Sequence, residues 1–117
     1  DCVFIYLRPK EESIQAAKEL ESQYPDRNAR PPLFGIPFTV KDSIDIAGLQ
    51  TTTGCPPLAR SPAESAVIYD RVINEGAFFI GKTNLEQLAT GMTGSSLRFA
   101  VKYIAHNLQD AEAHTVH

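Results

Sequence analysis

Apolar positions recur with a helical period along residues 11–24. They are spaced every three or four residues, and the positions between them are mostly charged. The members of the apolar stripe are Ile14, Ala17, Leu20 and Tyr24. Because this spacing collects the apolar side chains on one side of a helix, it predicts an amphipathic helix over residues 11–24. Pro25 ends the pattern, and Pro31-Pro32 then favours an extended connection.

The period shortens to two over residues 34–41, which predicts a strand. Ile36, Phe38 and Val40 fall on one face of that strand. Pro37 has no backbone N–H to donate to a neighbouring strand. We therefore expect Pro37 to lie at the start of the strand or at an edge of the sheet.

A second helix and a second strand follow in residues 61–80. In Ser61-Pro62-Ala63-Glu64, a hydroxyl, a proline in the first turn and a glutamate three residues after the hydroxyl form a capping pattern. This pattern predicts a helix that begins at Ser61. Its apolar stripe consists of Ala66, Tyr69, Val72 and Ile73. Gly76 is a natural helix stop, and the wholly apolar residues 77–80 predict a short buried strand.

The capping pattern recurs in Thr83-Asn84-Leu85-Glu86 and predicts another helix, which ends near Gly91. Strand, helix, strand and helix joined by short links are typical of an α/β fold with parallel strands. We therefore expect a βαβα unit, flanked by the N-terminal helix. Helical spacing also predicts a C-terminal amphipathic helix over residues 99–113. Its apolar residues are Val101, Ile104, Ala105, Leu108 and Ala111.

Composition places the chain among globular domains. Of its 117 residues, 43% are hydrophobic and 21% are charged, and 11 Lys+Arg against 14 Asp+Glu give a net charge of −3. The acidic balance argues against a general nucleic-acid surface, and no apolar run approaches the roughly 18 residues that cross a membrane. Cys2 and Cys55 fit free thiols in a reducing compartment. We therefore expect a cytoplasmic protein without nucleic-acid or membrane partners.

Both internal strands end in a lysine followed by polar residues. The two segments are Lys41-Asp42-Ser43 and Lys82-Thr83-Asn84. Because ligands gather at the carboxyl ends of parallel strands, we expect the two lysines to emerge on the same rim of the sheet. A lysine there can be a desolvated base, a Schiff-base nucleophile, an anion anchor or an ordinary solvated side chain.

Residues 76–83 match the literal P-loop string of glycine, four residues, glycine, lysine and threonine. A P-loop wraps phosphate with a flexible loop, whereas these four residues are the predicted strand and Gly76 is the helix stop. We therefore expect no nucleotide. His106, His114 and His117 are separated by eight and three residues, so they do not share one face of a helix. No metal site and no other cofactor is expected.

Three blocks resemble the opening of the amidase signature family, in the family's order and spacing. They read PLFGIPFTVKDSIDIAGL at residues 32–49, TTTGCP at residues 51–56 and GAFFIGKTNL at residues 76–85. Within this family, QLATG at residues 87–91 is similar to the allophanate hydrolase branch.

The resemblance implies a partial amidase-signature fold, α/β in class, in one truncated domain. Its parts are an N-terminal helix and linker at residues 1–31, an amidase-like core at residues 32–94 and a divergent tail at residues 95–117.

The resemblance also implies an amide hydrolase that uses a nucleophilic serine, a second serine with a cis peptide bond, and a lysine. The lysine corresponds to Lys41, whose neutral amine would act as a general base through the bridging serine. Asp42 and Ser43 would fix the loop that follows it. Four residues would line the same cavity: Thr51, Thr52, Thr53 and Gly54. Lys82 and Asn84 look like structural anchors that cap the following helix.

Members of the family carry both serines in a later segment rich in glycine and serine. Here Gly94-Ser95-Ser96 leads into a sequence unlike the family, and no glycine follows Gly94. Ser95 and Ser96 precede the position of the family's serines, so we interpret them as polar residues of a loop or a helix start.

From the resemblance and these departures we expect the chain to be the N-terminal portion of an allophanate-type amide hydrolase. Such hydrolases act on carbon–nitrogen bonds, and we expect this portion to be inactive alone because both serines are missing. A small amide substrate would bind once missing residues complete the site. The alternative is a non-catalytic α/β module that binds a partner or is vestigial. A truncated sheet leaves an open edge and uncovered apolar faces, which allow self-association.

Overall fold

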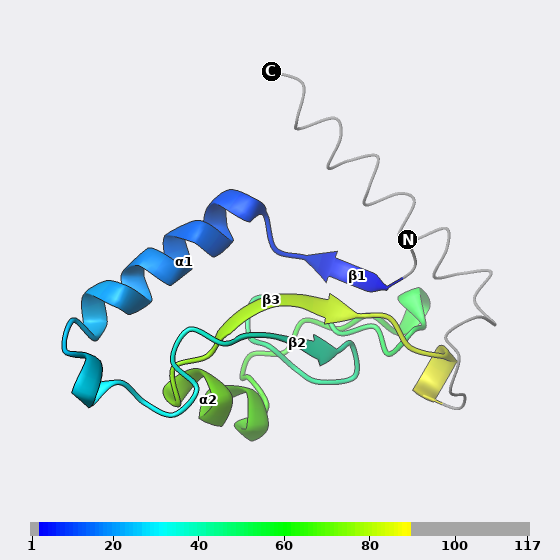
Figure 1. The fold of residues 1–117 in the computed structure, drawn as a ribbon. Coiled ribbons are helices and arrows are strands. Elements are labelled where there is room, and N and C mark those ends of the chain that lie inside the picture. The colour runs from blue at the N-terminus through cyan, green and yellow to red at the C-terminus, as the bar shows by residue number, and fades with distance from the viewer. Residues whose placement is uncertain (1–2, 90–117) are drawn as a thin grey trace, which may run out of the picture.

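The computed structural model describes residues 3–89 of the chain. Strands and α-helices occur in the order β1 (Phe4–Leu7), α1 (Lys10–Gln23), β2 (Pro37–Lys41), α2 (Val67–Asn74) and β3 (Phe78–Thr83). Short 3-10 turns accompany them: η1 (Arg27–Ala29), η2 (Pro56–Leu58) and η3 (Gln87–Ala89). Figure 1 shows the strands between the two helices, with β3 in the middle of the sheet. In this part of the chain, no helix has the length and apolar character that crossing a membrane requires.

The sheet is mixed. β2 and β3 run parallel and are connected through α2, whereas β1 pairs with the other side of β3 in the antiparallel direction. In the parallel ladder, Val40 lies opposite Lys82 and Lys41 lies opposite Thr83. The predicted α/β class and the parallel β2–α2–β3 unit are therefore confirmed. Among the strands described, β2 lies at an edge of the sheet.

Local sequence patterns set several of the element boundaries. α1 matches the helix predicted over residues 11–24, and Pro25 follows its end. β2 begins at Pro37, where the missing N–H is tolerated. α2 ends just before Gly76, which has a φ of 90°. The N–H of Gly76 donates to the carbonyl of Ile73 at 2.9 Å, so the predicted helix stop is confirmed.

The predicted helix start at Ser61 is wrong, because α2 begins only at residue 67. Contacts with another loop hold the preceding residues outside the helix. The Ser65 hydroxyl oxygen accepts a hydrogen bond from the Ala47 N–H at 2.9 Å. The Ala66 N–H donates to the Asp45 carbonyl, also at 2.9 Å. These long-range bonds outweigh the local capping pattern.

The helix predicted from Thr83 is also wrong as far as the described residues extend. Thr83 is the last residue of β3, and the Asn84 N–H donates to the carbonyl of Val3 at 2.8 Å. This bond continues the pairing beside β1, so sheet pairing overrides the capping pattern. The turn η3 follows, with Leu88 at a φ of 54°. The last two residues of this predicted helix, and the helix predicted over residues 99–113, lie outside the described residues.

β1 is a strand that periodicity does not reveal, because four residues are too few to establish a period. It fits beside β3 because Gly81 has no side chain. A Cβ atom on Gly81 would lie 2.6 Å from the Tyr6 carbonyl oxygen and 3.0 Å from a ring carbon of Phe4. The second glycine of the P-loop-like string therefore serves strand packing, and residues 78–83 form a strand in place of a phosphate loop.

The hydrophobic core lies where α2 packs against the sheet. Val40, Ile46 and Phe79 are buried at its centre. Partly buried residues pack around them: Tyr6, Phe38, Ile44, Leu49, Tyr69 and Ile73. Alternate residues of β2, including Lys41, are exposed on the opposite face of that strand. One face of β2 is therefore anchored in the core, and the other is open.

Replacing Gly76 with alanine should destabilise the fold more than the same change at Gly48. Both glycines have a left-handed backbone, with φ of 90° and 83°, so each substitution carries about 1–2 kcal/mol of strain. A Cβ on Gly76 would lie 2.6 Å from Pro31 Cγ and 3.0 Å from Phe34 Cα, whereas nothing lies within 4 Å of one on Gly48. We expect Gly76→Ala to lower the free energy of unfolding, measured with urea, by about 1–3 kcal/mol more than Gly48→Ala. Equal losses would contradict this packing argument.

Candidate active site

Two lysines lie at the carboxyl ends of the parallel strands, as the sequence predicts, but on opposite faces of the sheet. Lys41 is the last residue of β2, and its side chain is exposed. Lys82 is next to last in β3, and only 1% of its surface is exposed. The register explains the difference. Val40 lies opposite Lys82, and side chains alternate along a strand, so Lys82 shares the buried face of Val40 while Lys41 points the other way.

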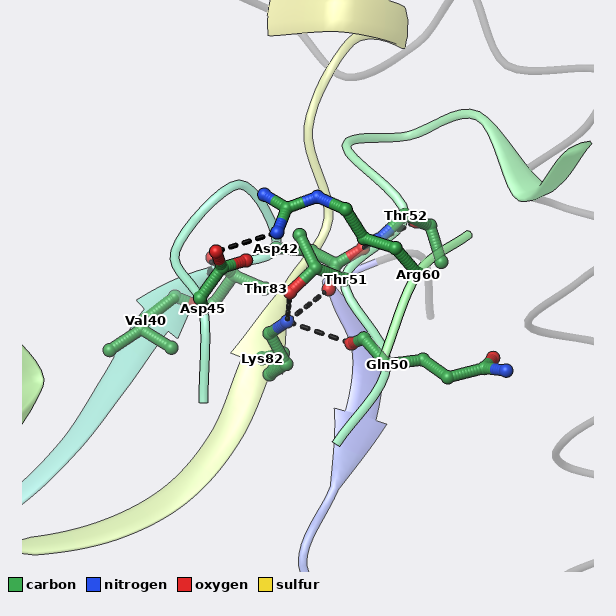
Figure 2. A network of polar contacts seen from close by, with 9 residues as sticks. All are labelled: Val40, Asp42, Asp45, Gln50, Thr51, Thr52, Arg60, Lys82 and Thr83. Atoms are coloured by element: carbon green, nitrogen blue, oxygen red, sulfur yellow. Dashed lines mark hydrogen bonds and ion pairs between the residues drawn. The ribbon is translucent and has the colours of Figure 1, made fainter. Parts of the chain in front are cut away.

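The Lys82 ammonium is buried with three oxygen partners, which Figure 2 shows around its nitrogen atom. Lys82 Nζ lies 2.7 Å from Asp42 Oδ1. It also donates to the Gln50 carbonyl oxygen at 2.8 Å and to Thr51 Oγ1 at 3.1 Å. The contact with Asp42 is an ion pair and the other two are hydrogen bonds, so three oxygen atoms from one loop surround the buried charge. The sequence predicts that Lys82 caps a helix, whereas in the structure Lys82 joins β3 to the loop that follows β2.

Asp42 is the other half of this ion pair, and it is completely buried. Its second carboxylate oxygen, Oδ2, accepts hydrogen bonds from the Thr52 N–H at 3.0 Å and from the Thr52 hydroxyl. The backbone of Asp42 is held as well. Its N–H donates to the Thr83 carbonyl at 3.0 Å, and its carbonyl accepts from the Thr53 N–H at 3.2 Å. Asp42 thus joins the ends of both parallel strands to the segment around Thr52.

The segment 51–54 lies against this ion pair, as Figure 2 shows for Thr51 and Thr52. Both of these threonines are buried, and their hydroxyl groups bond to Lys82 and Asp42. Thr53 has a φ of 52°, an uncommon conformation for a β-branched residue. Its N–H bonds to Asp42 and its carbonyl accepts from the Leu88 N–H at 2.9 Å, so contacts on both sides hold it there.

Ser43 and Gly54 complete the set of predicted site residues. Ser43 is half-buried in the turn directly after Asp42, and Gly54 is buried with a φ of 69°. The structure therefore gathers the predicted residues from Asp42 to Gly54 around the end of β2, with Lys41 on the open side.

A surface ion pair, absent from the predicted site, extends the network outwards. Arg60 Nη1 lies 2.6 Å from Asp45 Oδ2, and Arg60 exchanges backbone hydrogen bonds of 2.9 and 3.0 Å with Thr51. The hydrogen bond from Arg60 is the main cause that holds the pKa of Asp45 below its ordinary value of 3.8. Partial burial opposes this shift, while Thr51 and Lys82 reinforce it. The sequence has no local spacing that predicts this pair, because 15 residues separate Asp45 from Arg60.

Within residues 3–89, no three or more His, Cys, Asp or Glu side chains lie close enough together to hold a metal ion. Cys55 is buried. His106, His114 and His117 lie outside the described residues.

The fold and the site together define an α/β domain with a polar network at the carboxyl end of a parallel strand pair. Residues 4–109 match the sequence model of the family named Amidase, and the chain belongs to that family. The match extends on both sides of residues 32–94, the part of the sequence that resembles the amidase signature family.

Relatives and solved structures agree with this assignment. The chain is 39% identical to urea amidolyase of Saccharomyces cerevisiae over 95 residues, which covers 81% of this chain and 5% of that protein. It is 41% identical over 76 residues to the acylamidase of Rhodococcus erythropolis, covering 64% of this chain and 16% of that protein. The chain thus spans a small part of the curated relatives that it matches.

Among solved structures, the allophanate hydrolase of Kluyveromyces lactis matches with a TM-score of 0.65 and 38% identity, covering 79% of this chain and 15% of that one. The peptide amidase of Stenotrophomonas maltophilia matches with a TM-score of 0.64 and 33% identity, covering 75% of this chain and 18% of that one. The predicted resemblance to the amidase signature family, and within it to the allophanate hydrolase branch, is confirmed.

Lys82→Met should strongly destabilise the fold, because it leaves the Asp42 carboxylate buried without its cation. We expect the free energy of unfolding, measured with urea, to fall by about 3–5 kcal/mol. Asp42→Asn/Lys82→Met removes both charges and should recover most of that loss. Lys18→Met, at an exposed position of α1, is the control and should change the free energy by less than about 0.5 kcal/mol. A small effect of Lys82→Met alone would contradict the observed pairing.

Acidification should weaken the fold through Asp45. Its pKa is lower in the folded chain than its ordinary 3.8, so the ionised carboxylate stabilises the fold above about pH 4. That contribution is lost as the pH falls below about 4, towards the folded pKa. The stability difference between the unaltered chain and Asp45→Asn should therefore shrink between about pH 6 and about pH 3 in urea titrations. Because the pair is partly exposed, we expect a difference of at most about 1 kcal/mol. A difference that does not change with pH would contradict this assignment.

Proposed function

We propose that this chain contributes the lysine-bearing part of an amidase-family active site, which hydrolyses carbon–nitrogen bonds of small, allophanate-like amides. The observation that carries the proposal is the placement of Lys41. It ends a parallel strand inside the block that resembles the family, and its amine lies on the open face of the sheet. Ligands bind at the carboxyl ends of strands in such sheets.

In the proposed reaction, the neutral amine of Lys41 accepts a proton from a bridging serine. That serine in turn accepts the proton of the nucleophilic serine, whose oxygen attacks the carbonyl carbon of the amide. The carbon–nitrogen bond breaks, and the nitrogen leaves with the proton that the lysine returns. Water then releases the acyl group by the same sequence of proton transfers.

Both serines have to come from residues other than those resembling the family here. The family's serine segment is rich in glycine, and this sequence has no glycine after Gly94. Lys41 is exposed on the open face, where a completing segment would pack against it. The chain alone is therefore proposed to be inactive towards amides.

The surrounding residues have supporting roles in this proposal. Asp42 and Ser43 hold the turn that follows Lys41. Residues 51–54 form the wall of the substrate cavity, with the Thr51 and Thr52 side chains bound to the network beneath it.

Until the site is completed, uncovered apolar side chains favour self-association. Val67 and Ile68, at the start of α2, are 67% and 58% exposed, and Ile36 beside β2 is 52% exposed.

A chimera tests the proposal directly. The segment of Kluyveromyces lactis allophanate hydrolase that this chain matches is replaced by residues 3–89, and ammonia release from allophanate is measured. We expect the chimera to release ammonia, and Lys41→Ala in the chimera to slow the release by at least about 100-fold, the usual contribution of a general base. The 117-residue chain alone should release none.

Lys18→Ala in the same chimera is the matched control and should retain activity. A folded chimera without activity that depends on Lys41 would overturn the proposed function, and would favour a non-catalytic binding module. Steady hydrolysis by the chain alone, lost in Lys41→Ala, would show instead that no completing residues are needed.

A further inference from the structure

We propose that Lys82 is a positioning residue for Lys41: its buried ammonium group fixes the turn after β2 and thereby directs the Lys41 amine to the open face of the sheet. The inference deepens the proposed function and rests on it, since it assigns a role to Lys82 in the site that Lys41 would serve. Lys82 itself lies on the other face and reaches no substrate.

The direction of the Lys41 side chain follows from the residues on either side of it. Val40 before it is buried in the core, and Asp42 after it is completely buried on the same side. Val40 precedes Lys41 in β2, so the alternation of the strand turns Lys41 outwards. Asp42 begins the turn that follows, and its burial holds the chain on the other side of Lys41. The direction of Lys41 is therefore held from both sides, and Asp42 is the polar one of its two neighbours.

An ion pair and hydrogen bonds keep Asp42 inside. A buried carboxylate is unfavourable unless it is paired and hydrogen-bonded. Lys82 supplies the cation at 2.7 Å, and Thr52 supplies two hydrogen bonds. The same ammonium binds Gln50 and Thr51, so a single side chain from β3 holds both the beginning and the end of the loop 42–51.

The buried pair of Asp42 and Lys82 consists of charged residues where apolar side chains could also pack. A buried ion pair contributes little net stability compared with apolar side chains of the same volume. It does select one geometry, because every donor and acceptor in it must be satisfied together. The three acceptors of Lys82 all lie in the loop that follows Lys41, so the geometry selected is that of this loop.

Without the ammonium group, Asp42 would turn towards water and the backbone at the end of β2 would rotate with it. Three amide protons report on that region. The Asp42 N–H bonds to Thr83, the Ile44 N–H bonds to the Lys41 carbonyl at 2.9 Å, and the Thr53 N–H bonds to Asp42. The Arg8 N–H, which bonds to Ile80 at 2.8 Å, and the Tyr69 N–H, which bonds to Ala66 at 2.9 Å, are reference amides elsewhere in the fold.

The test is amide hydrogen exchange, followed by NMR on the full chain. In Lys82→Met, we expect exchange at Asp42, Ile44 and Thr53 to accelerate at least about tenfold more than at Arg8 and Tyr69, because local opening does not require global unfolding. Asp42→Asn/Lys82→Met removes the stranded charge but still lacks the bonds to Gln50 and Thr51, so the three amides should remain faster than in the unaltered chain. A full return to the original protection would show that the ammonium group does not fix the turn, and would overturn the proposal. Lys18→Met is the control and should leave all five amides unchanged.

A purely structural role for Lys82 predicts a different pattern, in which all five amides accelerate equally. That result, or no acceleration at the three amides, would overturn the proposal. If Lys82→Met does not fold, Thr51→Val removes a single acceptor of the ammonium group. It should accelerate the same three amides selectively, and equal acceleration of all five would again overturn the proposal.

The exchange experiment involves no substrate, so its outcome is independent of the chimera. Equal acceleration at all five amides together with an active chimera would reject the positioning role and leave the proposed function standing. Selective acceleration together with a folded but inactive chimera would reject the catalytic use of Lys41, while Lys82 would still set the direction of its side chain.

Discussion

The course of the loop after β2 depends on one buried ion pair, Asp42 with Lys82. Neither charge can be buried alone, because an unpaired ion in a protein interior costs on the order of several kcal/mol. Once paired, the ammonium group still needs two further acceptors and the carboxylate needs donors for its second oxygen. These requirements draw the backbone at Gln50 and the hydroxyl groups of Thr51 and Thr52 into contact with the ends of β2 and β3. The path of the loop 42–51 is therefore set by the hydrogen bonds and the ion pair that the charges of Lys82 and Asp42 require.

The same loop constrains the chain further from the pair. Once Thr51 is fixed by Lys82, its backbone bonds to Arg60 bring the next segment alongside, and the pairing of Arg60 with Asp45 closes the contact. The Ala66 N–H then bonds to the Asp45 carbonyl, and α2 can begin only after that point. The late start of α2 therefore follows from the contacts of Ser65 and Ala66 with the loop that carries Asp45.

This chain of dependence explains which features the sequence could predict. Elements with a local signal were predicted: the helix ended by Pro25, a strand within residues 34–41, which in the structure begins only at Pro37, and the helix stop at Gly76. Features decided by residues far apart in sequence were not. The capping pattern at Ser61 loses to bonds with another loop, the one at Thr83 loses to sheet pairing, and β1 is too short to show a period. For the site, the sequence placed both lysines at one edge of the sheet, but only the strand register shows which of them is buried.

The register also determines which lysine is available for chemistry. If the pairing of β2 with β3 shifted by one residue, the side chains of one strand would move to the other face of the sheet. Lys41 and Lys82 would then lie on the same face. In the observed register, Lys82 and Asp42 form a buried ion pair, and Lys41 is left on the open face beside a turn that hydrogen bonds hold on both sides. In the proposed function, a completing segment would then meet a lysine whose direction is set in advance. Preorganisation of this kind lowers the entropy lost on association, because the turn need not be ordered again at that moment. The buried pair therefore matters to the proposed function through the freedom it removes from the neighbouring residue.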